Sequence, residues 1–206
     1  KHRSSPVEKA NLDEYFDVVV IDEAQYIGNE QRGNSWLRAI LGVQSEEIHI
    51  CCSLNSVRLI RKIIEECNDE CEVVYHERST PLTIEQKDFM GLEDVEEGDA
   101  LIVFSRKKVL RTVEQLNQQG IKASAIYGSL PPETRRKQVD DFLNGETKVV
   151  VATDSIGMGM NLPIKRVVFL EVEKFDGKEK RELLTQEVKQ IAGRAGRRGM
   201  FPEGKV

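Results

Sequence analysis

The chain has 206 residues, of which 39% are hydrophobic and 32% are charged, an ordinary composition for a globular protein. No apolar run approaches the roughly 18 residues of a membrane-spanning helix, and no signal-peptide pattern opens the chain, so a spanning protein is excluded. The net charge of −5 hides an asymmetry, since residues 1–100 hold 10 basic and 22 acidic side chains, whereas residues 101–206 hold 20 and 13. This split predicts two bodies with different partners, and the basic second half keeps nucleic-acid binding open.

Apolar runs typical of strands alternate with helical patterns along the chain. In the first half we expect strands at 15–21, 47–52 and 72–75, and helices at 35–41 and 56–67. The pattern then breaks down in an acidic stretch with Pro81, Gly91 and Gly98, where we expect only a short strand at 81–84. In the second half we expect strands at 100–104, 122–127, 147–152 and 166–170, and helices at 107–118, 131–143 and 182–192.

Continuous apolar strands separated by helices indicate parallel sheets covered on both faces, and therefore an α/β fold. We expect two parallel-sheet domains, at 1–77 and 100–206, joined by an interdomain connector at 78–99. The first domain would lack the strands that precede Tyr15, so its sheet should be incomplete and should expose apolar surface.

The four cysteines favour a reducing compartment over a disulfide scaffold. Cys51 and Cys52 lie in an apolar run and are expected to be buried thiols, while Cys67 and Cys71 have a CxxxC spacing. A zinc site built from all four is the alternative, although zinc-binding pairs usually show tighter spacing.

Two acids end the first predicted strand, in the sequence VVVIDEAQ. Ligands bind at the carboxyl edge of open α/β sheets, so Asp22 could hold Mg²⁺ and Glu23 could orient or deprotonate an attacking water. The alternative is a pair of solvated acids that close a strand.

The segment GNEQRGNS at 28–35 imitates a phosphate-binding loop but has Asn34 where that loop needs a lysine. It also follows the acidic strand instead of preceding it. We therefore expect a turn and the start of a helix here, and no phosphate cradle.

The segment VVVATDSIGMGMNLP at 149–163 places several polar and small residues after a buried strand. Gly157 and Gly159 would allow a close approach of a ligand, and Thr153 could donate to a nucleic-acid phosphate. Asp154 and Asn161 could contact a ribose or nearby arginines. Met158 and Met160 are interpreted as packing residues.

The segment QIAGRAGRRG at 190–199 spaces Arg194 and Arg197 three residues apart among glycines. Arginines at this spacing could both face a triphosphate, where an arginine finger accelerates phosphoryl transfer by roughly 10³–10⁵. The alternative is a basic, glycine-rich surface loop.

Together, IDEAQ, LIVFSRK, YGSLPPETR, VVVATDSIGMGMNLP and QIAGRAGRRG stand in the order of motifs II, IV, IVa, V and VI of superfamily 2 helicases. SLPPETR, ATDSIGMGMNLP and RGNSWLRAILG most resemble the mitochondrial degradosome RNA helicase family and its bacterial relatives, of the DExH type. The resemblance covers residues 12–200. It implies two RecA-like domains, the first truncated at its N-terminus, with Mg²⁺ and ATP in the cleft between them and a nucleic-acid strand crossing both.

The resemblance also implies roles for individual residues. Asp22 would hold Mg²⁺, Glu23 would activate water, and Gln25 would couple the nucleotide to motif VI. Residues 52–54 occupy the place of motif III without matching its usual Ser-Ala-Thr. Gln190, Arg194 and Arg197 would act on the nucleotide from the second domain, with Gly157, Gly159 and Asn161 beside it. The nucleic-acid contacts would come from Ser105, Gly128, Ser129, Thr153 and Asp154.

The implied parent is an ATP-dependent helicase acting on single-stranded or partly duplex RNA, with RNA-decay nucleases as partners and no membrane association. The bacterial cytoplasm or the mitochondrial matrix would be its location. Motif I is missing from the sequence, so we expect this chain to be a fragment that is inactive alone. Two alternatives stay open, a non-catalytic fragment with weak RNA binding and a DNA helicase of the same superfamily.

Overall fold

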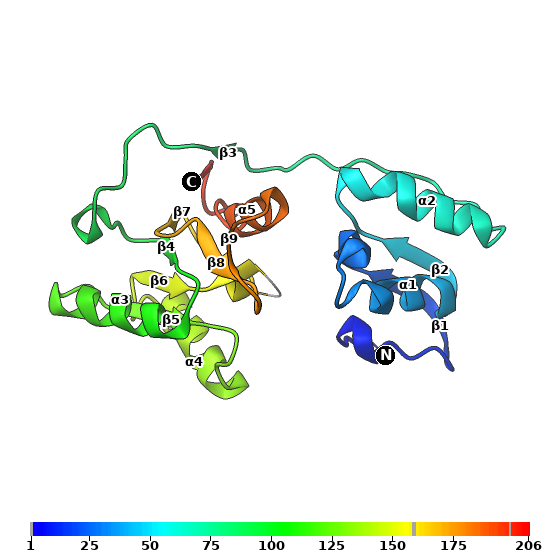
Figure 1. Cartoon of the computed structure of the whole chain (residues 1–206), viewed down its shortest axis with the longest axis horizontal. Coiled ribbons are helices and arrows are strands. Elements are labelled where there is room, and N and C mark those ends of the chain that lie inside the picture. Colours follow the sequence, from blue (N-terminus) through cyan, green and yellow to red (C-terminus); the bar gives the residue numbers. More distant parts are fainter. Residues whose placement is uncertain (1, 158–159, 198) are drawn as a thin grey trace. The chain divides into compact units, whose positions relative to one another are not determined.

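The computed structural model describes residues 2–157, 160–197 and 199–206, and the chain forms two compact units, at 1–75 and 76–206. Both units contain parallel β-sheet and α-helices, so the predicted α/β class is confirmed (Figure 1). Among the described residues, no helix is both long enough and apolar enough to cross a bilayer.

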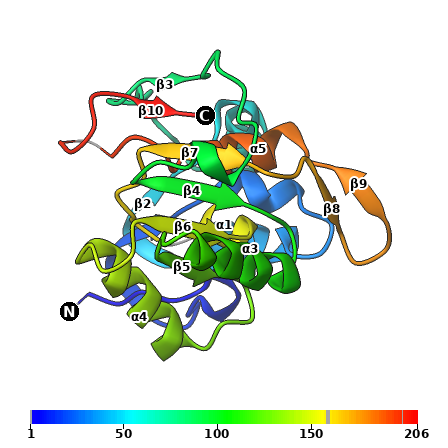
Figure 2. The ribbon, with the colours of Figure 1, turned by 90° about the vertical axis from the view of Figure 1, so that its left-hand side faces the viewer.

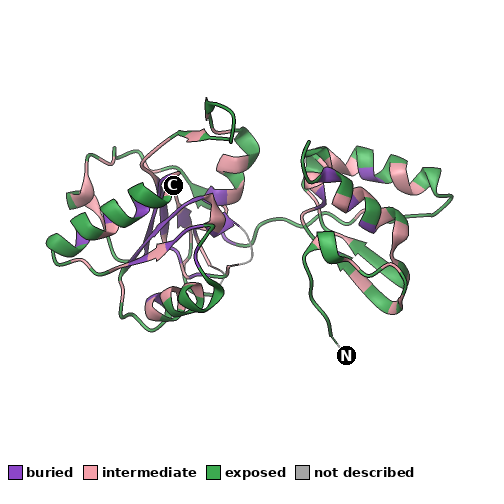
Figure 3. Cartoon of the chain, turned by 60° about the horizontal axis from the view of Figure 1, so that its bottom comes forward, coloured by how far each residue is buried: buried purple, intermediate pink, exposed green. Residues whose placement is uncertain are grey.

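The first unit is built on a parallel pair of strands. β1 (Tyr15–Ile21) pairs with β2 (Gln44–Ile50), α1 (Gly33–Gly42) connects them, and α2 (Val57–Glu66) follows. A small core forms around Trp36, packed with Ile21, Ala39 and Ile60. The predicted exposure of apolar surface is confirmed, since Val18 and Val20 on β1 are 51% and 62% exposed (Figure 3).

Two expectations for this unit are wrong. Residues 72–75 form no strand, and Val74 and Tyr75 are exposed because this segment pairs with no neighbour among the described strands. Cys51 is exposed and Cys52 half-buried, so they are not the buried thiols we expected. They follow the end of β2, where the chain leaves the sheet, and of the two only Cys52 packs against the core of the first unit. All four cysteines are free, and no metal-binding cluster of three His, Cys, Asp or Glu side chains occurs in the described part of the chain.

The second unit is built on a six-stranded parallel sheet with the order β3-β10-β7-β4-β6-β5 (Figure 2). Its strands are β3 (Leu82–Thr83), β4 (Asp99–Ile102), β5 (Ala123–Ile126), β6 (Val149–Ala152), β7 (Arg166–Phe169) and β10 (Gly204–Lys205). Its helices are α3 (Arg106–Gln118), α4 (Pro132–Leu143) and α5 (Thr185–Ala192).

Alternate residues of the central strands enter two separate cores. On β4, Ala100 and Ile102 pack with Phe142 of α4 and Ile191 of α5. Leu101, also on β4, packs in the other core with Val109 of α3. Every residue of β4 and β6 is buried, which explains the continuous apolar runs at 100–102 and 149–152.

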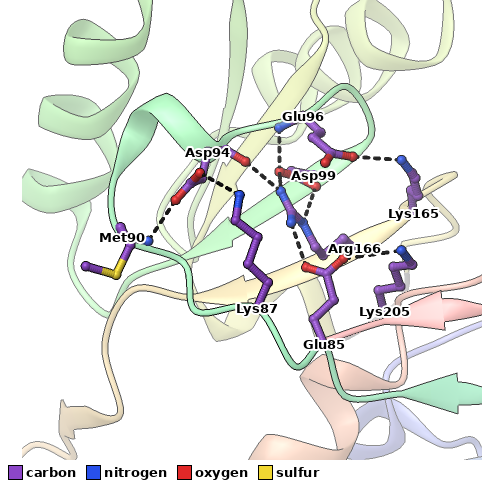
Figure 4. Close-up of polar contacts among 9 residues, drawn as sticks. All are labelled: Glu85, Lys87, Met90, Asp94, Glu96, Asp99, Lys165, Arg166 and Lys205. Carbon is purple, nitrogen blue, oxygen red and sulfur yellow. Dashed lines mark hydrogen bonds and ion pairs between the residues drawn. The ribbon is translucent and has the colours of Figure 1, made fainter.

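The segment at 78–99, expected as an interdomain connector, lies within the second unit. β3 pairs with β10, and the guanidinium of Arg166 on β7 binds residues between 85 and 99 of this segment (Figure 4). Arg166 donates to both carboxylate oxygens of Asp99 at 2.9 and 2.6 Å, to Glu85 at 2.7 Å and to the Asp94 carbonyl at 2.9 Å. These charge-assisted bonds hold the segment against the sheet.

One supersecondary element was not foreseen from the sequence. β8 (Glu173–Phe175) and β9 (Lys180–Glu182) form an antiparallel hairpin. Glu182 is therefore in a strand, and the helix predicted from residue 182 begins at Thr185.

Candidate nucleotide and nucleic-acid site

The acid pair lies where the sequence predicts it, directly after the carboxyl end of β1. The Asp22 carbonyl accepts a hydrogen bond from the indole of buried Trp36 at 2.9 Å, and Ala24 N–H donates to the Cys51 carbonyl at 2.9 Å. Glu23 has a φ of 55°, a left-handed conformation that residues with a side chain adopt rarely. Such local strain is typical of functional sites, and here the turn is held from both sides.

Gln25 connects the acid pair to the end of the second strand. Its side-chain amide donates to the Glu23 carboxylate, and its side-chain oxygen accepts from Ser53 N–H at 3.2 Å. Ser53 belongs to the segment that takes the place of motif III in the sequence order. The structure therefore brings Glu23, Gln25 and Ser53 into one hydrogen-bonded group.

The acid pair fits a magnesium ion that is bound mainly through a nucleotide. Mg²⁺ in nucleotide sites is held by one or two carboxylates together with phosphate oxygens and waters, so a cage of protein ligands is not required. Asp22 is exposed at the sheet edge, and its Oδ1 accepts from Glu23 N–H at 2.8 Å. Because a carboxylate has several lone pairs, this hydrogen bond leaves it able to ligate a cation.

The glycine-containing segment at 28–35 forms a turn and the start of α1, as predicted. A Cβ at Gly33 would lie 2.2 Å from the Ile27 carbonyl oxygen, so close backbone packing explains this glycine. Asn29 accepts from Gln31 N–H and Arg32 N–H, which closes the turn.

In the second unit, the arginine segment folds back onto the loop that follows β6. Arg194 donates to the carbonyls of Gly157 and of Met160, the latter at 3.5 Å. Gln190 donates to the Gly157 carbonyl at 3.4 Å, and Arg197 to the Asn161 carbonyl at 3.4 Å. Five predicted site residues from two distant segments are thus brought together. Gly159 and Met158, also singled out in the sequence, lie outside the described residues.

A cavity of about 410 Å³ lies beside this group. Arg194, Arg197 and Asn161 line it, together with residues of the segment that opens the second unit. The full lining consists of Arg78, Ser79, Thr80, Met160, Asn161, Leu162, Gly193, Arg194, Gly196 and Arg197. Its three arginines make it suited to an anionic ligand.

The predicted nucleic-acid contacts follow three neighbouring parallel strands and so share the carboxyl edge of the sheet. Gly128 and Ser129 are exposed after β5. Ser105 follows β4 and caps α3, its hydroxyl accepting from Lys108 N–H at 3.2 Å. Thr153, after β6, is 8% exposed, and its hydroxyl donates to Ser155 at 3.0 Å. The exposed members of this edge are therefore better placed for a ligand than Thr153.

Asp154 takes part in a partly buried ion cluster that ties the β6 loop to α5. Lys174 of β8 contacts Asp154 at 2.9 Å and Glu187 of α5 at 2.5 Å. Burial opposes ionisation of Glu187, but hydrogen bonds from Arg181, Lys174 and Leu184 N–H outweigh it and lower the pKa to about 2. The hairpin thus fixes the start of the helix that carries Gln190.

Three residues at the site escape prediction from the sequence. Glu171, after β7, accepts from Phe104 N–H at 3.0 Å and pairs with Lys108. Lys174 and Arg78 also act through contacts between distant segments. No local pattern marks any of them, because each lies in an irregular or short element whose partners are set by the tertiary fold.

Two family models match the chain. Residues 1–76 match the DEXQ-box helicase domain of Suv3, and residues 83–199 match the helicase conserved C-terminal domain. Among curated proteins, the chain resembles "ATP-dependent RNA helicase SUV3, mitochondrial" of Oryza sativa, with 43% identity over 100% of this chain. It is 41% identical to the protein of that name in Saccharomyces cerevisiae over 94% of this chain. The chain spans only 36% and 27% of those two relatives.

Among solved structures, the chain resembles S. cerevisiae Dbp5 bound to RNA and ADP BeF3, with a TM-score of 0.64 and 18% identity. The match covers 92% of this chain and 52% of Dbp5. At this identity the likeness shows the fold alone, and it agrees with the predicted helicase architecture. The motif order, the fold and the two family matches together establish that the chain belongs to the Suv3 family of superfamily 2 DExH-type helicases and spans parts of both its DEXQ-box and C-terminal helicase domains.

Proposed function

We propose that this chain forms part of an ATP-dependent RNA helicase that couples hydrolysis of Mg²⁺-ATP to movement along RNA. The observation that carries the proposal is that the arginine segment and the β6 loop, far apart in sequence, meet beside one cavity. Its relatives are named ATP-dependent RNA helicases, which supports ATP as the anionic ligand and RNA as the strand.

In this proposal the acids of the first unit and the arginines of the second act on the same nucleotide. Asp22 would hold Mg²⁺, which would supply charge neutralisation at the phosphates, and Glu23 would orient or deprotonate the attacking water. Arg194 and Arg197 exchange their backbone carbonyl partners for phosphate oxygens, with Arg197 as the finger. Binding of ATP draws the two units together, and hydrolysis releases them, so that the RNA strand steps.

The RNA strand passes along the carboxyl edge of the six-stranded sheet. Ser105, Gly128 and Ser129 contact its phosphates, and Asp154 and Thr153 shape the adjoining loop. Phosphate contacts make affinity fall with salt and confer no base preference, as a helicase requires. We propose the mitochondrial matrix as its location, in line with the names of its relatives. RNA-decay nucleases are proposed partners there.

The role of Glu23 is tested by Glu23→Gln in the complete helicase, meaning this chain with the remaining length that its relatives have. We expect RNA-stimulated ATP turnover to fall by about 10² or more because the carboxylate that orients or deprotonates the attacking water is lost, with RNA binding retained. Glu30→Gln, which neutralises an exposed acid in the following turn, is the matched control. Unchanged turnover in Glu23→Gln would remove Glu23 from the mechanism.

A second candidate concerns the chain as it stands. The segment at 28–35 is a turn and helix start, with no lysine to bind the β- and γ-phosphates. We therefore propose that these 206 residues alone bind RNA weakly and do not turn over ATP. Sustained ATP hydrolysis by the purified chain would refute this. Competition between RNA and DNA strands for stimulating the complete helicase separates the RNA helicase from a DNA helicase of the same superfamily.

A further inference from the structure

The loop that carries Arg194 and Arg197 lies near the end of the second unit's sequence, and it accepts hydrogen bonds from an arginine near the start of that sequence. Arg78 lies in the segment that opens this unit, 115 to 118 residues before the loop residues it contacts. We propose that Arg78 is a positioning residue that holds Arg194 and Arg197 in the geometry needed to meet a nucleotide. The catalytic part of this inference rests on the proposed function.

The guanidinium of Arg78 contacts carbonyl oxygens around the end of α5. It donates to Gly193 at 2.9 Å, to Gly196 at 3.4 Å and also to Ala195. Its Nε donates at 2.6 Å to the Thr80 carbonyl in its own segment. Carbonyls just past a helix end carry partial negative charge, so a cation there is stabilising. The planar fork of arginine directs its donors at several such acceptors in one fixed geometry, which the compact ammonium of lysine cannot reproduce.

The same loop is enclosed by backbone on its other sides. Gly196 N–H donates to the Ile164 carbonyl at 2.8 Å, and Gly204 N–H donates to the Pro81 carbonyl at 2.8 Å. A Cβ at Gly196 would lie 2.6 Å from the Gly204 nitrogen. Gly196 also has a φ of +75°, which favours glycine. The backbone of this loop is therefore closely packed. Among the contacts described for the carbonyl oxygens of residues 193, 195 and 196, those from a side chain all come from Arg78.

Arg78 also stands at the covalent junction of the two units. The first unit ends at Tyr75 and the second begins at His76. From Arg78 onward the segment is fixed to the second unit, first at this loop and then through Glu85 and Asp99 on Arg166. Strain applied to the junction during a cycle would therefore reach the arginine loop through Arg78 before it reached the sheet.

Amide hydrogen exchange on the chain itself tests the contact without requiring any activity. The N–H groups of residues 193–196 all donate to backbone carbonyls, so each should be measurably protected. In Arg78→Met, which keeps the aliphatic stem, we expect these four amides to exchange about tenfold faster, while those of β4 and β6 keep their rates. Arg111→Met, on the exposed face of α3, is the matched control. Unchanged exchange at 193–196 would overturn the proposal.

The catalytic consequence is measured in the complete helicase. We expect Arg78→Met to lower kcat for RNA-stimulated ATP hydrolysis about tenfold, with KM for RNA unchanged, since the RNA edge is untouched. Arg78→Lys should restore less than half of the loss, because one ammonium replaces a fork. Faster exchange with normal kcat would overturn the positioning role and leave the helicase proposal intact. A wild-type protein without ATP turnover would instead refute the proposed function, and the exchange experiment would still decide the contact.

Discussion

Asp99 is fully buried at the start of β4, and its charge is matched by a single guanidinium. Arg166 bonds both of its carboxylate oxygens, and Glu96 N–H adds a third donor at 2.8 Å (Figure 4). A buried ion pair of this kind is weak evidence for net stabilisation. Removal of one partner, however, leaves an uncompensated charge in the interior.

We therefore expect Asp99→Asn to lower the free energy of unfolding of the second unit by about 3 kcal/mol, measured by urea unfolding with far-UV circular dichroism. The control is Glu97→Gln, which breaks an exposed pair with Lys148 and should cost less than about 1 kcal/mol. Equal effects of the two substitutions would show that the buried pair is not the anchor of the 85–99 segment.

Glu187 makes a pH-dependent contribution to stability. Its folded pKa of about 2 lies below its ordinary value of 4.5, so its ionised form is favoured by folding. This stabilisation is present above pH 4.5 and is lost as the pH falls toward 2. In Glu187→Gln, urea midpoints should therefore differ from wild type at pH 5–7 and converge with it as the pH falls to about 2. A difference that stays constant with pH would exclude ionisation of Glu187 as the cause.

At the scale of elements, strands and helices with a regular apolar pattern are predictable and tertiary partners are not. β4 and β6 are continuous apolar runs because both of their faces are covered, and α3 is marked by its spacing of apolar residues. The β8–β9 hairpin carries no such pattern because its strands are short and mostly charged, and β10 carries none because pairing with β3 and β7 defines it. β3 lies within the short strand predicted at 81–84. Arg78 and Lys174 escape prediction because their contacts are made with distant segments, whereas the motif residues can be recognised from their local sequence.

The cap of α3 allows helix stability and RNA binding to be separated at one residue. Ser105→Ala removes the acceptor for Lys108 N–H and should cost about 1 kcal/mol of stability. Ser105→Asp keeps a good cap and should restore that stability, yet it should weaken RNA binding because its charge repels phosphate. Fluorescence anisotropy with labelled RNA and urea unfolding measure the two effects. Normal RNA affinity in Ser105→Asp would remove Ser105 from the proposed RNA path.

At the scale of the whole molecule, the two units have cores of unequal size. The six-stranded sheet is filled on both faces, whereas the two-stranded sheet exposes Val18 and Val20 (Figure 3). Because free energy of unfolding depends on the apolar area buried, the first unit should be the less stable.

The chain's single tryptophan, Trp36, is buried in the first unit and so reports on that unit alone. We expect its fluorescence transition in urea to precede the main transition in far-UV circular dichroism, which the larger second unit dominates. Trp36 also packs on Tyr26, so Tyr26→Leu should shift the fluorescence transition alone. Coincident transitions would show that the two units unfold as one cooperative body.

The contact between Gln25 and Ser53 bears on how this helicase family varies in sequence. Gln25 binds the backbone N–H of residue 53, a group that every residue except proline possesses. This contact therefore does not depend on which side chain residue 53 carries, and proline is the one residue type that could not make it. The departure of residues 52–54 from Ser-Ala-Thr therefore leaves this link to the acid pair intact, because the main chain makes it.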